Sequence, residues 1–281
     1  MKDLRNRGAF ITGAANGIGL GIATELARSG VDIVLADIEA GALEAARTQV
    51  EALGVRAFAV TVDVSDRASV QRAADHAVAA LGQVHIVVNN AGVSLGPIPI
   101  AEVDDTQWDW ILGVNLRGVV NGIAAFLPHL RAHGEDAHIV NTASIGGLQV
   151  NPGLTNGSYC ATKYAVVAVS EELALETRSS NIGVSVLCPA LVTTTLRHSL
   201  ERRPERFGGP SPTQRSPGDN ARLLATGHAI EPDAVGRRVV AAIRNRDFFI
   251  FTHAHTREWL EARHARILEG YDQLDAFLAQ G

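Results

Sequence analysis

The chain has 281 residues, is 46% hydrophobic and carries a formal net charge of −5, which is enough apolar content for a substantial core. Scattered basic residues argue against nucleic acid as a partner, and no apolar run reaches the roughly 18 residues of a membrane span. The only cysteines, Cys160 and Cys188, indicate reduced thiols rather than a disulfide framework. We therefore expect a single soluble, cytoplasmic domain over residues 1–281.

A glycine-rich turn follows the first expected strand, residues 9–11, and opens a helix to about residue 28. The glycine spacing is G-x-x-x-G-x-G, which on its own also occurs in tight turns. Between a strand and a helix N-terminus, however, such a turn binds anions, because glycine permits close backbone approach and unpaired N–H groups face a pyrophosphate. The residues expected to bind a dinucleotide here are Gly13, Asn16, Gly17, Ile18 and Gly19.

The second expected strand, residues 32–36, ends in Asp37. A carboxylate at this place accepts hydrogen bonds from both hydroxyls of an adenosine ribose and repels a 2′-phosphate. No basic residue follows Asp37 directly, and the glycine-rich turn carries neutral Asn16 where a cation would hold that phosphate. The sequence therefore favours NAD over NADP, and a simple capping role of Asp37 for the next helix is compatible with this interpretation.

Strands and helices then alternate, with helices at 40–53 and 66–81 and strands at 55–60 and 84–88. This rhythm predicts an α/β fold, a doubly wound parallel sheet of Rossmann type with helices on both faces. Ligands of such sheets bind beyond the carboxyl ends of the strands. The further residues expected at that edge are Asp63, Val64, Asn90, Ala91 and Gly92.

The next expected helix, 108–130, is broken near Gly113 or Gly118 and contains Asn115, a residue type that usually serves as a hydrogen-bonding group inside helices. The helix has a wide apolar face, made of Val119, Val120, Ile123, Phe126, Leu127 and Leu130. A face of this width can be more than one subunit buries by itself. A strand at 138–141 follows, and Ser144 lies just beyond it at the same carboxyl edge.

Tyr159 and Lys163 lie four residues apart in an expected helix, 157–174, with Ser158 as its N-cap, and so share one helix face. A free phenol has a pKa of about 10, and a nearby ammonium lowers it. A base competent near neutral pH needs a shift of roughly 2 to 3 units, or about 3 to 4 kcal/mol. Alone, the pair is more typical of a packed ring beside a solvated charge. At this edge it predicts proton transfer to or from an alcohol or carbonyl oxygen.

The last third of the chain adds a strand at 183–187, a helix at 232–245 and a strand at 248–251. Residues 195–228 include an Arg-, Pro- and Gly-rich stretch that we interpret as a mobile substrate lid. Residues 252–281 form a C-terminal helical extension, one-sided over 255–278, that predicts a docking or subunit-interface helix. Three histidines there, His253, His255 and His264, lack the pattern of a metal site, and none is expected.

In this order, the glycine-rich turn, Asn90-Ala91-Gly92, Asn115, Ser144 and Tyr159-x-x-x-Lys163 resemble the short-chain dehydrogenase/reductase family over about residues 10–251. The resemblance implies a nicotinamide cofactor and a catalytic tetrad of Asn115, Ser144, Tyr159 and Lys163. It implies that Tyr159 is the general acid/base and that Ser144 hydrogen-bonds the substrate oxygen. Lys163 would lower the pKa of Tyr159 and hold the nicotinamide ribose, while Asn115 would position a water in a proton relay.

Further implications of the resemblance are cofactor contacts by Pro189, Val192 and Thr194, and a homodimer or homotetramer built on the helices of Asn115 and Tyr159. The chain departs from the family pattern in Pro189-Ala190, where the family usually has Pro-Gly, and in Ala143-Ser144, where it often has Ser-Ser. The methyl of Ala190 slightly restricts the backbone that leads to Val192 and Thr194.

The lid and tail resemble a bacterial subgroup that oxidises bulky secondary alcohols, with the aryl-ether benzylic alcohol dehydrogenases of lignin breakdown as an example. The leading hypothesis is thus an NAD-dependent dehydrogenase of a bulky, hydrophobic or aromatic secondary alcohol. Two alternatives stay open, an NADPH-dependent ketone reductase of a biosynthetic pathway and a non-catalytic NAD-binding protein.

Overall fold

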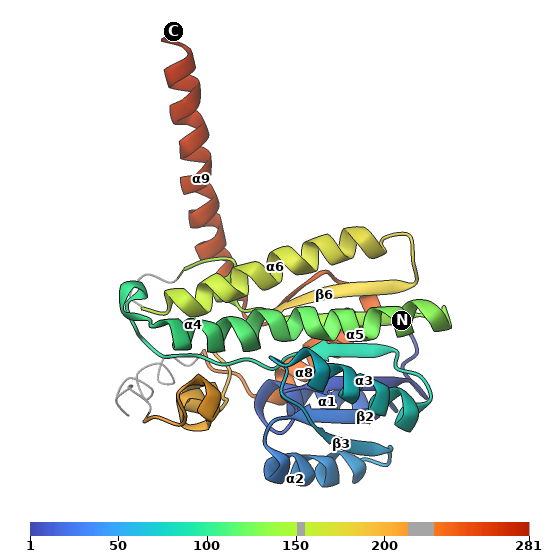
Figure 1. Ribbon diagram of the computed structural model, residues 1–281. Coiled ribbons are helices and arrows are strands. Elements are labelled where there is room, and N and C mark those ends of the chain that lie inside the picture. The colour runs from blue at the N-terminus through green and yellow to red at the C-terminus, as the bar shows by residue number, and fades with distance from the viewer. Residues whose placement is uncertain (151–154, 213–227, 281) are drawn as a thin grey trace.

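Seven parallel strands form one sheet in the order β3-β2-β1-β4-β5-β6-β7, in a computed structural model that describes residues 1–150, 155–212 and 228–280. This confirms the expected doubly wound parallel sheet (Figure 1). The strands are β1 Gly8–Thr12, β2 Asp32–Asp37, β3 Ala57–Thr61, β4 Ile86–Asn89, β5 Ala137–Thr142, β6 Ile182–Cys188 and β7 Phe249–Phe251.

Helices cover both faces of the sheet, α1, α2 and α8 on one side and α3, α5 and α6 on the other. The α-helices are α1 Gly17–Arg28, α2 Ala40–Glu51, α3 Arg67–Leu81, α4 Asp105–Leu112, α5 Gly118–His133, α6 Gly157–Thr177, α8 Pro232–Asn245 and α9 Arg257–Leu278. Short 3₁₀ segments are η1 Ile100–Glu102, η3 Ile145–Gly147, η4 Leu196–Arg202, η5 Glu205–Phe207 and η6 Ala254–Thr256.

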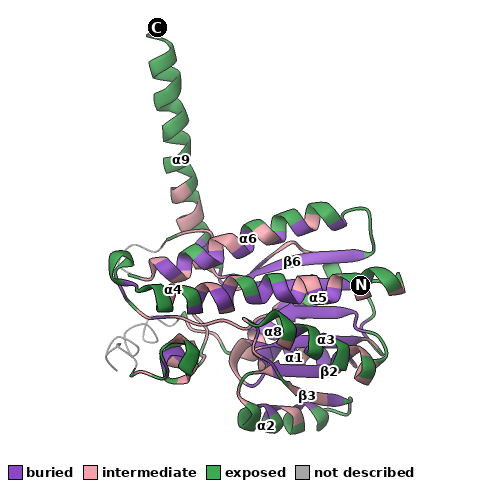
Figure 2. Cartoon of the chain, in the orientation of Figure 1, coloured by how far each residue is buried: buried purple, intermediate pink, exposed green. Residues whose placement is uncertain are grey.

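Most positions of the strands are apolar because both faces of the sheet are covered. In β2, Ile33 and Leu35 join the core beneath α1, α2 and α8, whereas Val34 and Ala36 join the core beneath α3 and α5. Successive side chains of a strand point to opposite faces, so one short apolar run supplies both cores. Figure 2 shows the result as a buried sheet inside helices whose outer faces are exposed.

The order of the strands in the sheet changes direction after β3, because β4 pairs with β1 on the side opposite to β2. A crevice at the carboxyl ends of the strands is expected at such a switch point. The glycine-rich turn after β1, Asp37 at the end of β2 and Asn90 after β4 all lie at this edge. The fold thus brings together the sequence signals that were expected to share one site.

The expected break near Gly113 or Gly118 is confirmed, because a π-helical segment, η2 Gly113–Arg117, joins α4 to α5. The extra residue per turn places Asn115 in the interior, fully buried. Across the described residues, the continuous helix Asp105–His133 is the one candidate that is long and apolar enough to cross a membrane. More than half of its most apolar stretch is buried within the fold, as for a core helix.

One expectation about the start of a helix is wrong, and the expected apolar face of α5 divides between internal packing and exposed surface. Ser158 does not cap α6, because the helix already begins at Gly157 after Asn156, and Ser158 is buried in its first turn. The apolar face of α5 mostly packs inside this chain, where Val119, Phe126 and Leu130 are buried. Only Val120 of that face is substantially exposed, at 41%.

The lid segment is described for residues 195–212, where η4 and η5 give it more regular structure than expected, while residues 213–227 of the expected lid lie outside the described residues. The tail helix begins slightly later than expected, with η6 preceding α9. Helix α9 extends away from the sheet and its covering helices (Figure 1), and its outer part is exposed on all sides (Figure 2).

Candidate active site

The turn between β1 and α1 has the backbone geometry that its glycines predict. Gly13 and Gly17 have positive φ values of 64° and 55°, and a Cβ on Gly19 would overlap the carbonyl oxygen of Gly13. Asn90 stabilises the turn from β4, because its Nδ2 donates to the carbonyl oxygen of Thr12 at 3.0 Å. The residues present therefore fit a bound pyrophosphate, with the N-terminus of α1 directed at it.

Asp37 lies next to this turn and keeps its carboxylate in place through two backbone N–H groups. Ala15 N donates to Oδ2 at 3.0 Å, and Glu39 N donates to Oδ1 at 3.2 Å. Each carboxylate oxygen has further lone pairs for additional donors. The arrangement suits a ribose beside the glycine-rich turn, as expected from the sequence.

Asp63 and Val64 follow β3 and also line the cavity. The carboxylate of Asp63, however, already accepts a hydrogen bond from the lid segment. Asp63 Oδ1 accepts from Ser65 Oγ at 2.6 Å, and Arg206 from η5 donates to Asp63 Oδ2 at 2.5 Å. Val64 is buried, and its carbonyl oxygen accepts from Asn121 Nδ2 at 2.9 Å. The contact between Arg206 and Asp63 could not be predicted from the sequence, because the two residues lie far apart along the chain.

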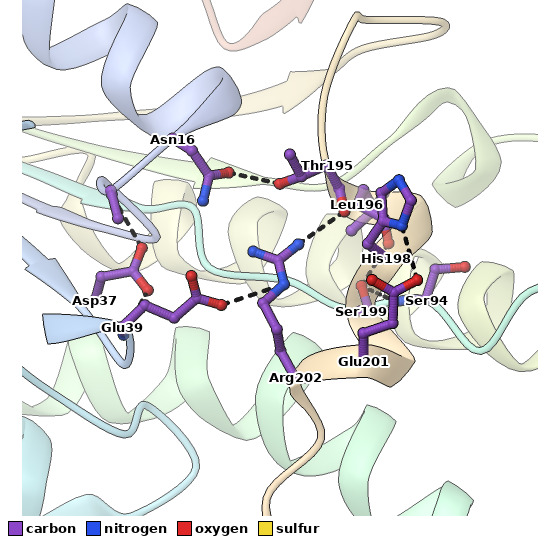
Figure 3. A network of polar contacts seen from close by, with 11 residues as sticks. Asn16, Asp37, Glu39, Ser94, Thr195, Leu196, His198, Ser199, Glu201 and Arg202 are labelled. Atoms are coloured by element: carbon purple, nitrogen blue, oxygen red, sulfur yellow. Dashed lines mark hydrogen bonds and ion pairs between the residues drawn. The ribbon is translucent and has the colours of Figure 1, made fainter. Parts of the chain in front are cut away.

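The lid segment makes two further contacts with the nucleotide end of the site (Figure 3). Thr195 Oγ1 donates to Asn16 Oδ1 at 2.8 Å, and Arg202 Nε pairs with Glu39 Oε1 at 3.2 Å. Arg202 Nη2 also donates to the carbonyl oxygen of Thr195 at 2.8 Å. Glu39 Oε1 is buried and has no hydrogen bond with a described residue, so the Arg202 guanidinium is what compensates its charge.

The four residues expected to carry the chemistry come from three places and line or border one cavity. Ser144 lies just after β5, Tyr159 and Lys163 share the first turns of α6, and Asn115 lies in η2. Ser144 Oγ accepts from Gly146 N at 3.1 Å and hydrogen-bonds with Tyr159. Lys163 Nζ donates to the carbonyl oxygen of Thr142 at 2.8 Å and lies 5.6 Å from the centre of the Tyr159 ring.

Asn115 connects the loop after β4 to α6. Its Oδ1 accepts from Val93 N at 2.8 Å, and its Nδ2 donates to the Val93 carbonyl at 3.0 Å and to Thr162 Oγ1 at 3.1 Å. A Cβ on Gly92 would lie 3.5 Å from both Asn115 Oδ1 and Lys163 Nζ. The glycine therefore keeps free the space between these two side chains.

The pKa of Tyr159 does not follow the expectation from sequence, which had Lys163 lowering it. Burial raises the pKa of Tyr159 to about 12, and the hydrogen bond with Ser144 acts in the opposite direction without outweighing burial. Burial also lowers the pKa of Lys163 to about 8. In the protein alone, desolvation thus disfavours the charged form of both groups.

The expected contacts after β6 also lie at this site. Ser144 Oγ donates to the Pro189 carbonyl at 3.4 Å, and Val192 bridges to Ile230. Thr194 approaches the glycine-rich turn, since a Cβ on Gly17 would lie 3.3 Å from its Cγ2. At the departure from the family pattern, Ala190 N donates to Thr252 Oγ1 at 3.4 Å.

These residues surround a cavity of about 850 Å³ that runs from Asp37 to Tyr159 and on to the lid segment and tail. Its far end is lined by large side chains that the sequence did not identify, among them Leu95, Trp110, Leu200, Phe207, His255 and Trp259. They come from separate loops and helix ends, so no local pattern could have grouped them. Ser199 fixes the lid segment to the opposite wall, where its Oγ accepts from Ser94 N at 3.2 Å.

The histidines near the tail pack ring against ring, and their nitrogens do not converge on one point as metal ligands would. His253 and His255 lie 5.5 Å apart between ring centres, and His253 Nε2 lies 2.8 Å from the carbonyl oxygen of His228. Over residues 1–150, 155–212 and 228–280, no group of three His, Cys, Asp or Glu side chains could hold a metal ion.

Known proteins with the same fold and sequence pattern define the class of this chain. Its residues 7–205 match the family model for short chain dehydrogenases. A C alpha-dehydrogenase from Sphingobium sp. strain SYK-6 is 33% identical over 278 residues, 98% of this chain and 90% of the relative.

Two solved structures are also similar. A short-chain dehydrogenase/reductase from Burkholderia phymatum in complex with NAD has a TM-score of 0.88 and 36% identity, and the match covers 96% of this chain and 97% of that one. A short-chain dehydrogenase from Burkholderia cenocepacia in complex with NADP has a TM-score of 0.75 and 27% identity, over 90% of this chain and 99% of that one.

The fold and site define a nicotinamide-dependent oxidoreductase with a Rossmann-type domain. The chain belongs to the short-chain dehydrogenase/reductase family.

Proposed function

We propose that this enzyme is an NAD-dependent dehydrogenase that oxidises a bulky, hydrophobic or aromatic secondary alcohol to the ketone. The observation that carries the proposal is one continuous cavity, with Asp37 at one end, Tyr159 and Ser144 in the middle and an apolar wall at the other end. Its volume of about 850 Å³ suits a dinucleotide portion together with a sizeable substrate.

The residues that would hold the cofactor occupy the half of the cavity near α1. We assign the pyrophosphate to Gly13, Asn16, Gly17, Ile18 and Gly19, the adenosine to Asp37, Asp63 and Val64, and the nicotinamide half to Asn90, Ala91, Gly92, Tyr159, Lys163, Pro189, Val192 and Thr194. When bound, the oxidised nicotinamide supplies the hydride acceptor and a positive charge.

Tyr159 is assigned as the general base that takes the hydroxyl proton of the alcohol, and as the acid in the reverse direction. Ser144 would hold the same substrate oxygen, because its Oγ already interacts with Tyr159. Since burial opposes the phenolate in the protein alone, a cation near Tyr159 is needed to make it a base. Lys163, with a pKa of about 8, is still mostly charged at pH 7 and supplies one such cation.

Asn115 is assigned a positioning role. Its three hydrogen bonds hold the loop after β4 at a fixed distance from α6, and Gly92 leaves room between it and Lys163. A water between Asn115 and Lys163 would complete a proton relay from Tyr159 toward solvent.

The preference for NAD rests on two carboxylates at the ribose end. Asp37 would accept both ribose hydroxyls, and Glu39 lies two residues further along with a buried oxygen. Arg202, a cation at this end of the site, is paired with Glu39 and is therefore less able to attract a 2′-phosphate. This supports NAD over NADP.

The substrate class rests on the far wall of the cavity. Phe207 and Trp259 line the cavity with partly exposed aromatic rings, beside the buried Trp110. Such a wall favours apolar, ring-containing ligands over small polar ones. The Sphingobium relative is named a C alpha-dehydrogenase, which is compatible with an alcohol carbon beside a bulky group.

The test is NADH and NADPH formation with a panel of aliphatic, steroidal and benzylic secondary alcohols. Turnover of bulky aromatic alcohols with NAD, and little with NADP, is the expected result. Ketone reduction that requires NADPH would favour the biosynthetic reductase instead. Binding of NAD without turnover of any panel member, in either direction, would favour the non-catalytic NAD-binding protein.

We also propose that the enzyme is a homodimer or homotetramer. Val120 on α5 and Leu175 on α6 remain exposed at 41% and 57%, on the two helices that the family resemblance assigns to a subunit interface. Most of the remaining exposed apolar surface lies on α9.

A further inference from the structure

Two histidines from separate parts of the chain meet in the cavity. His228 precedes α8 and His255 follows β7, and their ring centres lie 4.3 Å apart with a tilt of 33°. Both residues line the cavity that also contains Tyr159. Within the part of the chain that the structure describes, neither ring has a hydrogen-bond partner. The ring nitrogens of both residues can therefore serve a ligand in the cavity.

A third histidine fixes the position of this pair. His253 is buried, and its Nε2 lies 2.8 Å from the carbonyl oxygen of His228. A carbonyl oxygen only accepts, so Nε2 carries the proton. In the neutral ring Nδ1 then accepts from Thr252 Oγ1 at 2.6 Å. His253 thus joins the segment of His228 to the turn of His255, and both of its own nitrogens are used.

The pair lies beside the segment after β6, which is assigned above to the nicotinamide half of the cofactor. Two residues after His228, Ile230 N donates to the Leu191 carbonyl at 3.1 Å, and the Ile230 carbonyl accepts from another backbone N–H of the same segment at 3.0 Å. Three residues before His255, Thr252 Oγ1 accepts from this segment at 3.4 Å. Both histidines therefore belong to the substrate side of the cavity and not to its adenosine end.

The charges around the pair favour an uncharged ligand group. Partial burial and the neighbouring imidazoles of His228 and His253 lower the pKa of His255 from its usual 6.5, so this ring is neutral at pH 7. The cavity lining includes the carboxylate of Glu258, whose charge acts on His255, and the guanidinium of Arg197. These two charges are opposite in sign, so they provide no excess of positive charge for an anion.

We propose that His228 and His255 recognise a hydroxyl group that the substrate carries away from its reacting carbon, in a phenol or a second alcohol. The inference rests on the proposed function and specifies its substrate class. A neutral imidazole has one N–H donor and one acceptor nitrogen, so the pair can donate to a hydroxyl and accept from it at once. An ether or ketone oxygen would use only the donor, and an apolar group would use neither.

Trp259 adds an apolar surface beside this polar pair. Its ring meets His255 edge to face, at 5.3 Å and 77° between the ring planes, and it also lines the cavity. Polar groups at fixed places on an otherwise apolar wall are what orients a ligand in a pocket. The ring or chain that bears the hydroxyl would therefore pack on Trp259 while the hydroxyl itself binds between the imidazoles.

The first experiment compares kcat/KM for matched aryl methyl carbinols, one set with a phenyl and one with a biphenyl group. Each set carries a hydroxyl, a methyl or a carboxylate group at its para end. In the set whose length spans the cavity, the hydroxyl compound is expected to exceed the methyl compound about three- to tenfold, the range for one hydrogen bond between neutral groups. The difference should lie in KM, because the hydroxyl is remote from the reacting carbon.

The variants His228→Phe and His255→Phe keep a flat ring and remove the nitrogens. Each is expected to bring the ratio of hydroxyl to methyl compound close to one. His264→Phe makes the same exchange at an exposed position of α9 outside the cavity lining, and this matched control should keep the wild-type ratio. A wild type with equal kcat/KM for both compounds in both sets would overturn the proposal, and so would a hydroxyl preference that survives in both variants. A preference for the carboxylate that the variants lose would assign the pair to an anion and overturn the hydroxyl class.

Calorimetry separates this proposal from the proposed function. The ketones that correspond to these alcohols are titrated into enzyme with NAD, where no hydride can be transferred because both partners are oxidised. Tighter binding of the hydroxyl ketone than of the methyl ketone, lost in both variants, supports the site independently of whether the alcohols are oxidised. Equal binding of the two ketones, together with oxidation of other bulky alcohols, would refute the site and leave the function standing.

Discussion

Glu39→Gln tests whether the ion pair at the ribose end contributes to the preference for NAD. Glu39 and Arg202 are each 31% exposed and lie 3.2 Å apart, so at a dielectric constant near 20 their attraction is about 5 kcal/mol, and in bulk water about 1 kcal/mol. Because water reaches both side chains, the lower figure is the better guide. Loss of about 1 kcal/mol of the attraction that holds Arg202 at Glu39 predicts a roughly fivefold gain in relative NADP use.

The assay compares kcat/KM for NAD and NADP with one alcohol and, independently of turnover, the affinities for 5′-AMP and 2′,5′-ADP. Glu39→Gln is expected to strengthen 2′,5′-ADP binding while 5′-AMP binding changes little. Arg202→Gln added to Glu39→Gln is expected to abolish the gain, because the released guanidinium is what attracts the 2′-phosphate.

Two results would refute this reasoning. Equal changes for both nucleotides would mean that Glu39 only holds the lid segment in place. A gain in 2′,5′-ADP affinity that survives in the double variant would assign the effect to the lost carboxylate alone, without Arg202.

Three further predictions concern the reaction and the stability of the fold. Lys163→Ala is expected to lower both turnover and NAD affinity, measured by steady-state kinetics and calorimetry, whereas normal turnover would exclude its assigned role. Gly122→Ala should destabilise the protein by roughly 1–3 kcal/mol in urea, because a Cβ would overlap the buried Asn89 side chain, while Gly270→Ala on exposed α9 should be neutral or slightly stabilising. Burial lowers the pKa of His138 from 6.5 to about 3, so the unfolded chain binds a proton that the folded protein excludes. Stability should be complete above about pH 6.5 and fall by roughly 1.4 kcal/mol per pH unit below it, and His138→Asn should flatten this slope if the reasoning holds.

The fold followed from the sequence because its signals are local. Strands such as β2 are short apolar runs, glycine spacing marks the turn before α1, and helices such as α8 begin and end at the residues that the pattern indicates. The break around Asn115 was visible in the two glycines beside it. Each of these features depends on residues within a few positions of one another.

What the sequence missed depends on residues that are distant along the chain. The pairs of Arg202 with Glu39 and of Arg206 with Asp63 join the lid segment to the nucleotide end, and no spacing rule relates them. The expected effect of Lys163 on the pKa of Tyr159 was wrong for the protein alone, because proximity on a helix says nothing about burial. How the apolar face of α5 divides between internal packing and exposed surface likewise depends on residues that are distant along the chain.

Tyr159→Phe is the decisive variant for proton transfer by Tyr159, since it removes one oxygen and leaves the ring. With an alcohol that the wild type oxidises, kcat is expected to fall roughly 10²- to 10⁴-fold, while NAD still binds. Tyr164→Phe removes the same atom from another face of α6, where the ring lies beside Arg263 of α9, and this matched control should retain wild-type turnover. Turnover of Tyr159→Phe within a few-fold of the wild type would contradict the account.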